Sequence, residues 1–146
     1  MIQRIQTIWL LLASILSFVS LQTSFFSGIK QLTIDAAVQP EASYARLTGM
    51  SNWILLVATV LMALLALISI FLYNNRRIQM RVVLAGLLLS VGLIFLYYRE
   101  SLRFLPGQGT LDLTALVVMV IPFLFFLAIR GIYKDEYLVK SVNRIR

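Results

Sequence analysis

Four long runs of apolar residues constrain this chain more than any other feature of its sequence. They cover residues 8–26, 53–73, 82–98 and 111–129, and their only charged residue is Asp112, at the edge of the last run. Each is about as long as a helix needs to cross roughly 30 Å of hydrocarbon. The runs are continuous and do not alternate in polarity as membrane β-strands do, so we expect transmembrane helices, which satisfy their own backbone hydrogen bonds in lipid.

The composition supports an all-α membrane protein. Of the 146 residues, 60% are hydrophobic, whereas soluble domains have about 45–50%. A globule of this size cannot hide such an excess from water. We therefore expect one domain over residues 1–146, built as a four-transmembrane-helix bundle, with an outer loop at 27–52 and a cytoplasmic tail at 130–146.

The positive charges predict how the bundle is oriented. If alternate loops lie on opposite sides, four Lys and Arg residues fall on one side: Lys30, Arg46, Arg99 and Arg103. The other side carries nine: Arg4, Arg76, Arg77, Arg81, Arg130, Lys134, Lys140, Arg144 and Arg146. Short loops rich in Lys and Arg stay in the cytoplasm. Both termini and the loop YNNRRIQMR are therefore expected to be cytoplasmic, where they can contact anionic lipid.

This asymmetry also accounts for the basic character of the chain. The formal net charge is +7 and the pI is about 10.3, values that could indicate a nucleic-acid-binding protein. No nucleic-acid-binding motif accompanies the charge, however. We expect membrane lipids and no nucleic acid as partners.

Small and polar residues within the runs predict contact faces, since close packing drives helix association in lipid. Three such faces stand out: Ser14, Ser17, Ser20 and Ser24; Thr59, Ala63 and Ala66; Gly86 and Ser90. They could pack inside the bundle or dock another membrane protein. Gln22, Thr23 and Ser24 also form a candidate intramembrane polar site near the outer boundary, which could bond a loop or headgroup or line a ligand site.

Two segments outside the runs have their own patterns. In the outer loop, QLTIDAAV alternates weakly and SYARL could return beside it as a short β-hairpin, which would need support from helix ends or a partner. In the tail, an apolar stripe at Leu138, Val142 and Ile145 predicts a C-terminal amphipathic helix. Its charges are Asp135, Glu136, Lys140 and Arg144. This helix could lie on the inner leaflet, on a partner, or on the arginine loop, with Asp135 or Glu136 near Arg76 or Arg77.

Three segments resemble an uncharacterised family of small four-pass membrane proteins from Bacteroidota. They are the opening MIQRIQTIWLLLA, the loop LYNNRRIQMR and the close KDEYLVKSVNRIR. The resemblance implies a bacterial inner membrane and brings no catalytic residues.

The residue inventory limits the chemistry that the chain could perform. The sequence has no His and no Cys, so the usual zinc and haem ligands are missing. Its six acids are scattered, and there is no glycine-rich phosphate loop. We therefore expect no catalytic residues, no metal and no cofactor. The leading interpretation is a non-enzymatic accessory or assembly subunit of a larger membrane complex. The alternative is binding or transport of a lipid or apolar small molecule within the helix bundle.

Overall fold

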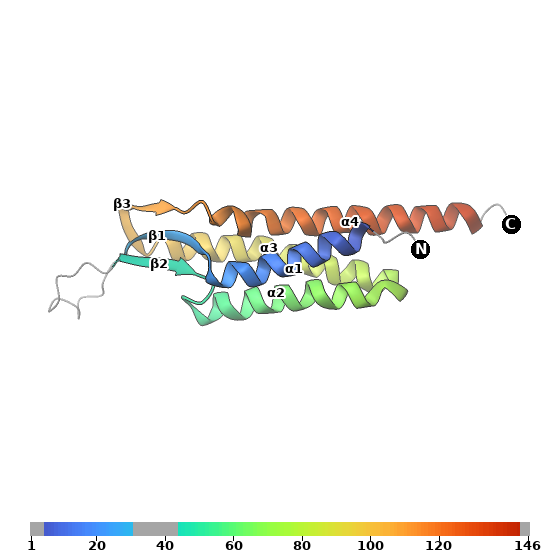
Figure 1. Ribbon diagram of the computed structural model, residues 1–146, viewed down its shortest axis with the longest axis horizontal. Coiled ribbons are helices and arrows are strands. Elements are labelled where there is room, and N and C mark those ends of the chain that lie inside the picture. The colour runs from blue at the N-terminus through green and yellow to red at the C-terminus, as the bar shows by residue number, and fades with distance from the viewer. Residues whose placement is uncertain (1–4, 31–43, 144–146) are drawn as a thin grey trace.

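Four long helices make up most of the molecule. The computed structural model describes residues 5–30 and 44–143 (Figure 1). Within them the helices are α1 (Ile5–Gln22), α2 (Trp53–Phe71), α3 (Arg76–Ser101) and α4 (Ala115–Asn143), and a short 3-10 turn, η2 (Leu72–Asn74), joins α2 to α3. All four are long and apolar enough to cross a membrane, which confirms the prediction of four such helices.

The helices form a ring in which neighbours run antiparallel. α1 packs against α2 and α4, and α3 packs against the same two helices from the other side. Successive helices reverse direction, so α1 begins and α4 ends at the same end of the bundle (Figure 1). This is an up-down-up-down arrangement.

The predicted small-residue faces pack inside this ring. The buried residues are Ser14, Ser17 and Ser20 of α1, Thr59, Ala63 and Ala66 of α2, and Gly86 and Ser90 of α3. The Ser17 hydroxyl donates to the Ala13 carbonyl of its own helix at 2.7 Å. A Cβ on Gly86 would lie 2.5 Å from the Phe125 ring of α4, so glycine lets these two helices approach closely. The faces are therefore contacts within the chain.

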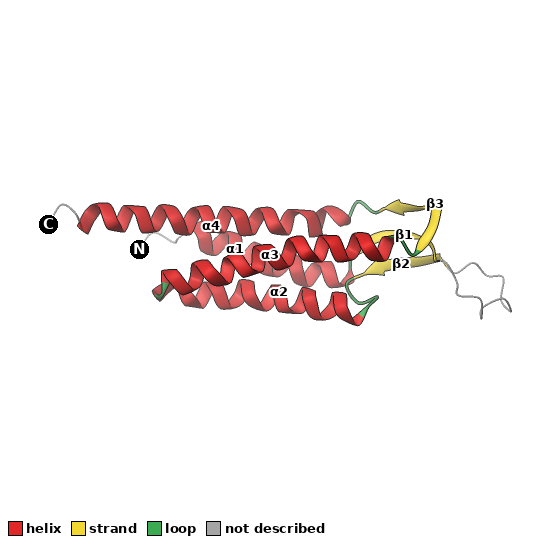
Figure 2. Cartoon of the chain, turned by 180° about the vertical axis from the view of Figure 1, so that it is seen from behind, coloured by secondary structure: helices red, strands yellow, loops and turns green. Residues whose placement is uncertain are grey.

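A three-stranded antiparallel sheet covers the opposite end of the bundle (Figure 2). Its strands are β1 (Ser24–Lys30), β2 (Tyr44–Thr48) and β3 (Phe104–Leu111), in the order β2-β1-β3. Ser27 of β1 lies opposite Arg46 on one side and Thr110 on the other. The central strand thus joins segments that are far apart in the sequence.

The sheet corrects the all-α prediction. A hairpin does form, but its first strand is β1, whose first three residues were expected to end the first helix and whose other residues were expected to begin the outer loop. Residues 31–38, the expected strand, lie outside the described residues. Phe25 and Phe26 made the first run look longer than its helix. In the structure Phe25 stacks on Tyr97 of α3, with ring centroids 4.8 Å apart, and Phe26 meets Phe104 edge-on at 5.2 Å.

Two helices extend further than predicted at the end opposite the sheet. α3 begins at Arg76 rather than near residue 82, so most of YNNRRIQMR is helical and is not a loop. α4 continues to Asn143 over 29 residues, so the tail up to that residue is not a separate helix. Arg, Gln and Met are good helix formers, so these helices continue past their apolar runs. The hydropathy of the runs therefore marked the apolar cores and not the helix ends.

Candidate functional site

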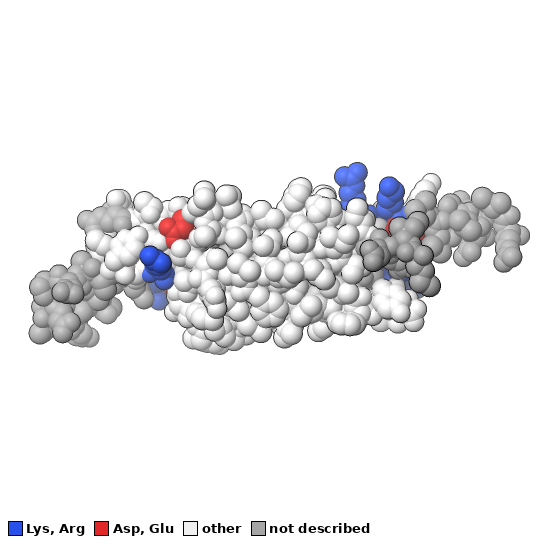
Figure 3. Space-filling model, in the orientation of Figure 1, with Lys and Arg blue, Asp and Glu red and all other residues white. Residues whose placement is uncertain are grey.

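Charged side chains lie at the two ends of the molecule and leave a long uncharged middle (Figure 3). Among the side chains that the structure describes, those at the sheet end are Arg46, Arg99, Glu100, Arg103 and Asp112. Among residues 5–30 and 44–143, no three His, Cys, Asp or Glu side chains come together as a metal site. A site for a charged ligand must therefore be sought at one of the ends.

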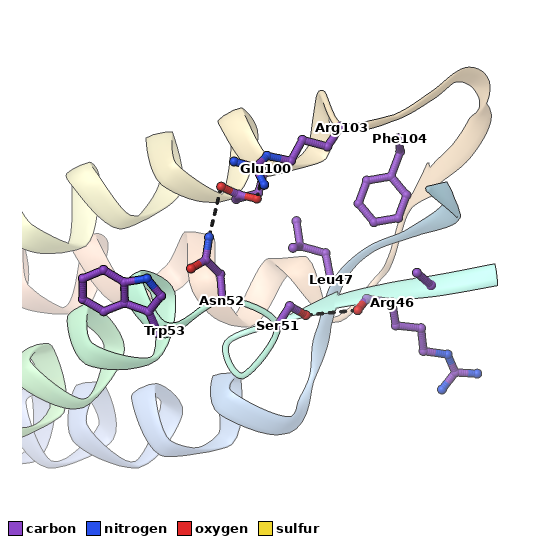
Figure 4. Close-up of a pocket in the computed structure, with 9 residues that line it drawn as sticks. Arg46, Leu47, Ser51, Asn52, Trp53, Glu100, Arg103 and Phe104 are labelled. Atoms are coloured by element: carbon purple, nitrogen blue, oxygen red, sulfur yellow. Dashed lines mark hydrogen bonds and ion pairs between the residues drawn. The ribbon is translucent and has the colours of Figure 1, made fainter. Parts of the chain in front are cut away.

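A pocket opens at the sheet end, between β2, the start of α2 and the end of α3 (Figure 4). It encloses about 490 Å³, within the range of about 300–1,000 Å³ that is usual for small-molecule sites. Its lining residues are Ala45, Arg46, Leu47, Ser51, Asn52, Trp53, Glu100, Arg103 and Phe104. Polar, cationic and aromatic groups thus share one cavity.

Glu100 forms the charged wall of this pocket. It is only 6% exposed, and burying a carboxylate is costly unless it is paired and hydrogen-bonded. Asn52 Nδ2 donates to Glu100 Oε1 at 3.2 Å. Arg103 Nε lies 3.2 Å from Oε2 and an Arg99 terminal nitrogen lies 3.6 Å from Oε1. Two guanidinium groups therefore share one carboxylate, and positive charge remains in excess.

The opposite wall is fixed by the turn between β2 and α2. Asn52 is the N-cap of α2, and its Oδ1 accepts a hydrogen bond from the Ile54 N–H at 3.2 Å. Ser51 Oγ accepts from the Thr48 N–H at 2.8 Å and donates to the Arg46 carbonyl at 3.2 Å. Asn52 uses one side-chain atom for its own helix and the other for Glu100, so capping and pocket formation are coupled.

Asp112 organises the other side of the sheet end. Its carboxylate accepts a hydrogen bond from the Ser27 hydroxyl, and its backbone N–H donates to the Phe25 carbonyl at 3.2 Å. Hydrogen bonds from Ser24 and then Ser27 hold the pKa of the Asp112 carboxyl below its ordinary value, and nearby Arg46 acts in the same direction while burial opposes them. Asp112 therefore ties the end of β3 to β1, just before α4 begins.

The arginine loop and the tail, singled out in the sequence, meet at the other end. Arg76 donates from a terminal guanidinium nitrogen to the Asp135 backbone carbonyl at 3.1 Å. The structure thus brings these two residues together as expected, through the carbonyl of Asp135. Arg77 and Arg81 are exposed. The helical backbone of α4 includes Glu136 and Lys140, whose side chains are not described, and Arg144 lies outside the described residues.

Gln22, Thr23 and Ser24 do not form a buried polar cluster. Gln22 is exposed and is the last residue of α1, and the Thr23 N–H donates to the Val19 carbonyl at 3.2 Å. Ser24 begins β1, and its carbonyl accepts a hydrogen bond from the Thr114 hydroxyl. The three residues mark the transition from helix to strand.

The buried polar residues that sequence reasoning missed lie elsewhere. Gln6 and Gln79 are 2% and 1% exposed, and Gln79 Nε2 donates to the Ser69 carbonyl at 2.9 Å. Within the described residues, neither Oε1 atom has a hydrogen-bond partner. A helical-phase signal could have revealed Glu100, because it continues the buried stripe of Ser90, Leu93 and Tyr97 at helical spacing.

Comparison with known proteins identifies the family. A family model described as a domain of unknown function, DUF4293, matches residues 2–145. The chain belongs to the DUF4293 family. The match spans all the DUF4293 helices and strands described above and confirms the resemblance to an uncharacterised family. No curated protein and no solved structure matches the chain.

Proposed function

We propose that this DUF4293 protein is a non-enzymatic, multi-pass protein of a bacterial inner membrane and serves as an accessory or assembly subunit of a larger complex. The uncharged middle of the bundle lies in the bilayer. The end with Arg76, Arg77 and Arg81 faces the cytoplasm, as do both termini, and the sheet lies on the outer face. The excess of Lys and Arg on the first side supports this orientation.

The observation that carries the proposal is the sheet itself. Among the described strands, β2 and β3 each pair only with β1. An edge strand presents backbone N–H and C=O groups that can pair with a strand from another protein. The edge strands also carry large exposed side chains, since Tyr44 is 64% and Leu111 57% exposed. This end of the molecule is therefore suited to docking a partner.

Site-specific photo-crosslinking tests the proposal. A photoreactive residue at Tyr44 or Leu111 should give discrete protein adducts in native membranes, identified by mass spectrometry after gentle extraction. The matched control is Leu88 in the middle of α3, which is 65% exposed and should react mainly with lipid. If positions 44 and 111 give no protein adducts beyond those at position 88, the subunit proposal fails.

The pocket favours a second function, the binding of a lipid or apolar small molecule. It lies at the sheet end, next to Trp53 and Phe104, and not beside Gln22 as the sequence suggested. A binding protein of this kind would retain its ligand through purification without any protein partner. Mass spectrometry of the intact purified protein distinguishes the two functions.

A further inference from the structure

We propose that the pocket beside Glu100 binds the phosphate group of a phospholipid from the outer leaflet. This inference rests on the proposed placement of the bundle in a membrane, but not on the existence of a protein partner. The ligand chemistry is an organic phosphate on an apolar body, and each part of it matches a different part of the pocket.

Charge selects the phosphate. Arg103 lines the pocket and contacts Glu100, and the neighbouring Arg99, which is not a lining residue, also contacts Glu100. Two positive groups therefore share one negative group and leave one positive charge uncompensated. Arg46 also lines the pocket, but its guanidinium points away from Glu100 (Figure 4), and its charge acts on Asp112. A guanidinium carries five N–H donors, and Arg103 contacts Glu100 through Nε. A guanidinium group of this kind can bind a phosphate group in a bidentate way.

The exposure of the two arginine side chains leaves them accessible to a ligand from the surroundings of the protein. The side chains of Arg99 and Arg103 are 54% and 58% exposed, whereas that of Glu100 is 8% exposed. The buried carboxylate therefore contacts both guanidinium groups, while much of each arginine side chain stays exposed.

Position selects a lipid over a free anion. Trp53 is the first residue of α2 and Glu100 lies in the last turn of α3, so the pocket sits where two candidate spans end. Phospholipid headgroups lie at that level, and Trp is enriched there because its ring is amphipathic. Trp53 is 74% exposed and can pack on the glycerol and upper acyl chain of a lipid whose phosphate enters the pocket.

Tryptophan fluorescence tests this inference in the purified protein. The chain has two Trp residues, Trp9 and Trp53, so Trp9→Phe leaves Trp53 as the only reporter. When the protein is held in micelles, a short-chain phosphatidylglycerol should change the Trp53 emission in a saturable way. A diacylglycerol of the same chain length should give no saturable change, and inorganic phosphate should bind at least about tenfold more weakly. Equal binding of diacylglycerol would overturn the phosphate assignment, and equal binding of inorganic phosphate would overturn the lipid assignment.

Charge variants test the residues. Arg99→Gln with Arg103→Gln should weaken phosphatidylglycerol binding at least about tenfold, since charge-assisted hydrogen bonds are lost. The matched control is Arg77→Gln with Arg81→Gln at the other end of α3, which should bind like the parent. Unchanged affinity in the folded first variant would overturn the proposal.

Glu100→Gln provides an independent test in case the double variant does not fold. Its amide oxygen can still accept from Asn52, while the negative charge that competes for the guanidinium groups is gone. Binding should tighten by at least about threefold, and unchanged or weaker binding would contradict the proposal. These measurements need no partner protein, so their outcome is separate from that of the crosslinking experiment.

Discussion

At the scale of single residues, the sheet end is held by polar side chains that each serve two elements. Asn52 caps α2 and also binds Glu100 of α3. Asp112 accepts from Ser27 in β1 and lies between β3 and α4. Each such residue fixes the position of one element relative to another, so a single substitution there should affect more than its own contact.

Asp112→Asn should change how stability depends on pH. The pKa of Asp112 is lowered from an ordinary value of 3.8, so the folded protein binds this proton less readily than the unfolded chain. The stabilisation is therefore complete above the ordinary pKa and is lost as pH falls through the folded pKa. Melting in detergent should show the parent more stable than Asp112→Asn at pH 7, with the difference shrinking below about pH 4. A difference that stays constant with pH would contradict this assignment.

Gly86→Ala should destabilise the bundle, because the added methyl group would press against the buried Phe125 ring. Overpacking of this kind costs about 1–3 kcal/mol. Gly92→Ala is the matched control in the same helix, where an added Cβ meets nothing within 4 Å. Gly92→Ala should be neutral or slightly stabilising, as Ala favours helices over Gly by about 1 kcal/mol. Equal melting temperatures for the two variants would show that α3 and α4 do not pack closely at Gly86.

At this scale the sequence predicted packing better than it predicted the pocket. Gly86 and Ser90 could be assigned to a contact face, because small residues at helical spacing have one common cause in membrane helices. Helical spacing could place Glu100 on the buried stripe of α3, but the pocket around it could not be predicted in the same way. Asn52, which donates a hydrogen bond to Glu100, lies 48 positions earlier in the chain. Only the fold brings the two together.

At the scale of elements, hydropathy found the helices but not the strands. A helix in lipid needs a long apolar run, and that requirement is visible in the sequence. The strands outside the bundle carry no such requirement: β3 contains Pro106, Gly107 and Gly109, which are depleted in strands generally. Gly109 is required there because a Cβ would collide with Phe26. The requirement for glycine at this position becomes visible only when β1 and β3 are paired in the sheet.

Engineered cysteine pairs test the strand order, and the natural chain has no cysteine to interfere. Ser27→Cys should form a disulfide with Arg46→Cys and, separately, with Thr110→Cys, since each pair is directly opposed in the sheet. Arg46→Cys with Thr110→Cys should not form a disulfide, because β1 lies between the two strands. The distance across two strand spacings exceeds the Cα–Cα distance of about 7 Å that a disulfide can bridge. Mass spectrometry after oxidation and digestion distinguishes the three pairs. Efficient linkage of the third pair would mean that β2 and β3 are neighbours.

At the scale of the whole molecule, the proposed orientation predicts the outcome of reporter fusions. Alkaline phosphatase, which is active only outside the cytoplasm, should be active when fused after Leu113 and inactive when fused after Asn75 or Arg146. A fluorescent protein that folds only in the cytoplasm should give the opposite result. Activity of the phosphatase after Arg146 would reverse the assigned orientation, because four spans place both termini on one side.

The order of the strands makes the sheet a check on membrane insertion. β1 and β2 both lie in the connection between α1 and α2, whereas β3 lies in the connection between α3 and α4. The three can join only if both connections reach the same side. A chain whose second pair of helices inserted upside down would leave β3 on the wrong side and expose the edge of β1. That uncovered strand would present unpaired backbone N–H and C=O groups, so a misinserted molecule would be prone to pair with other chains.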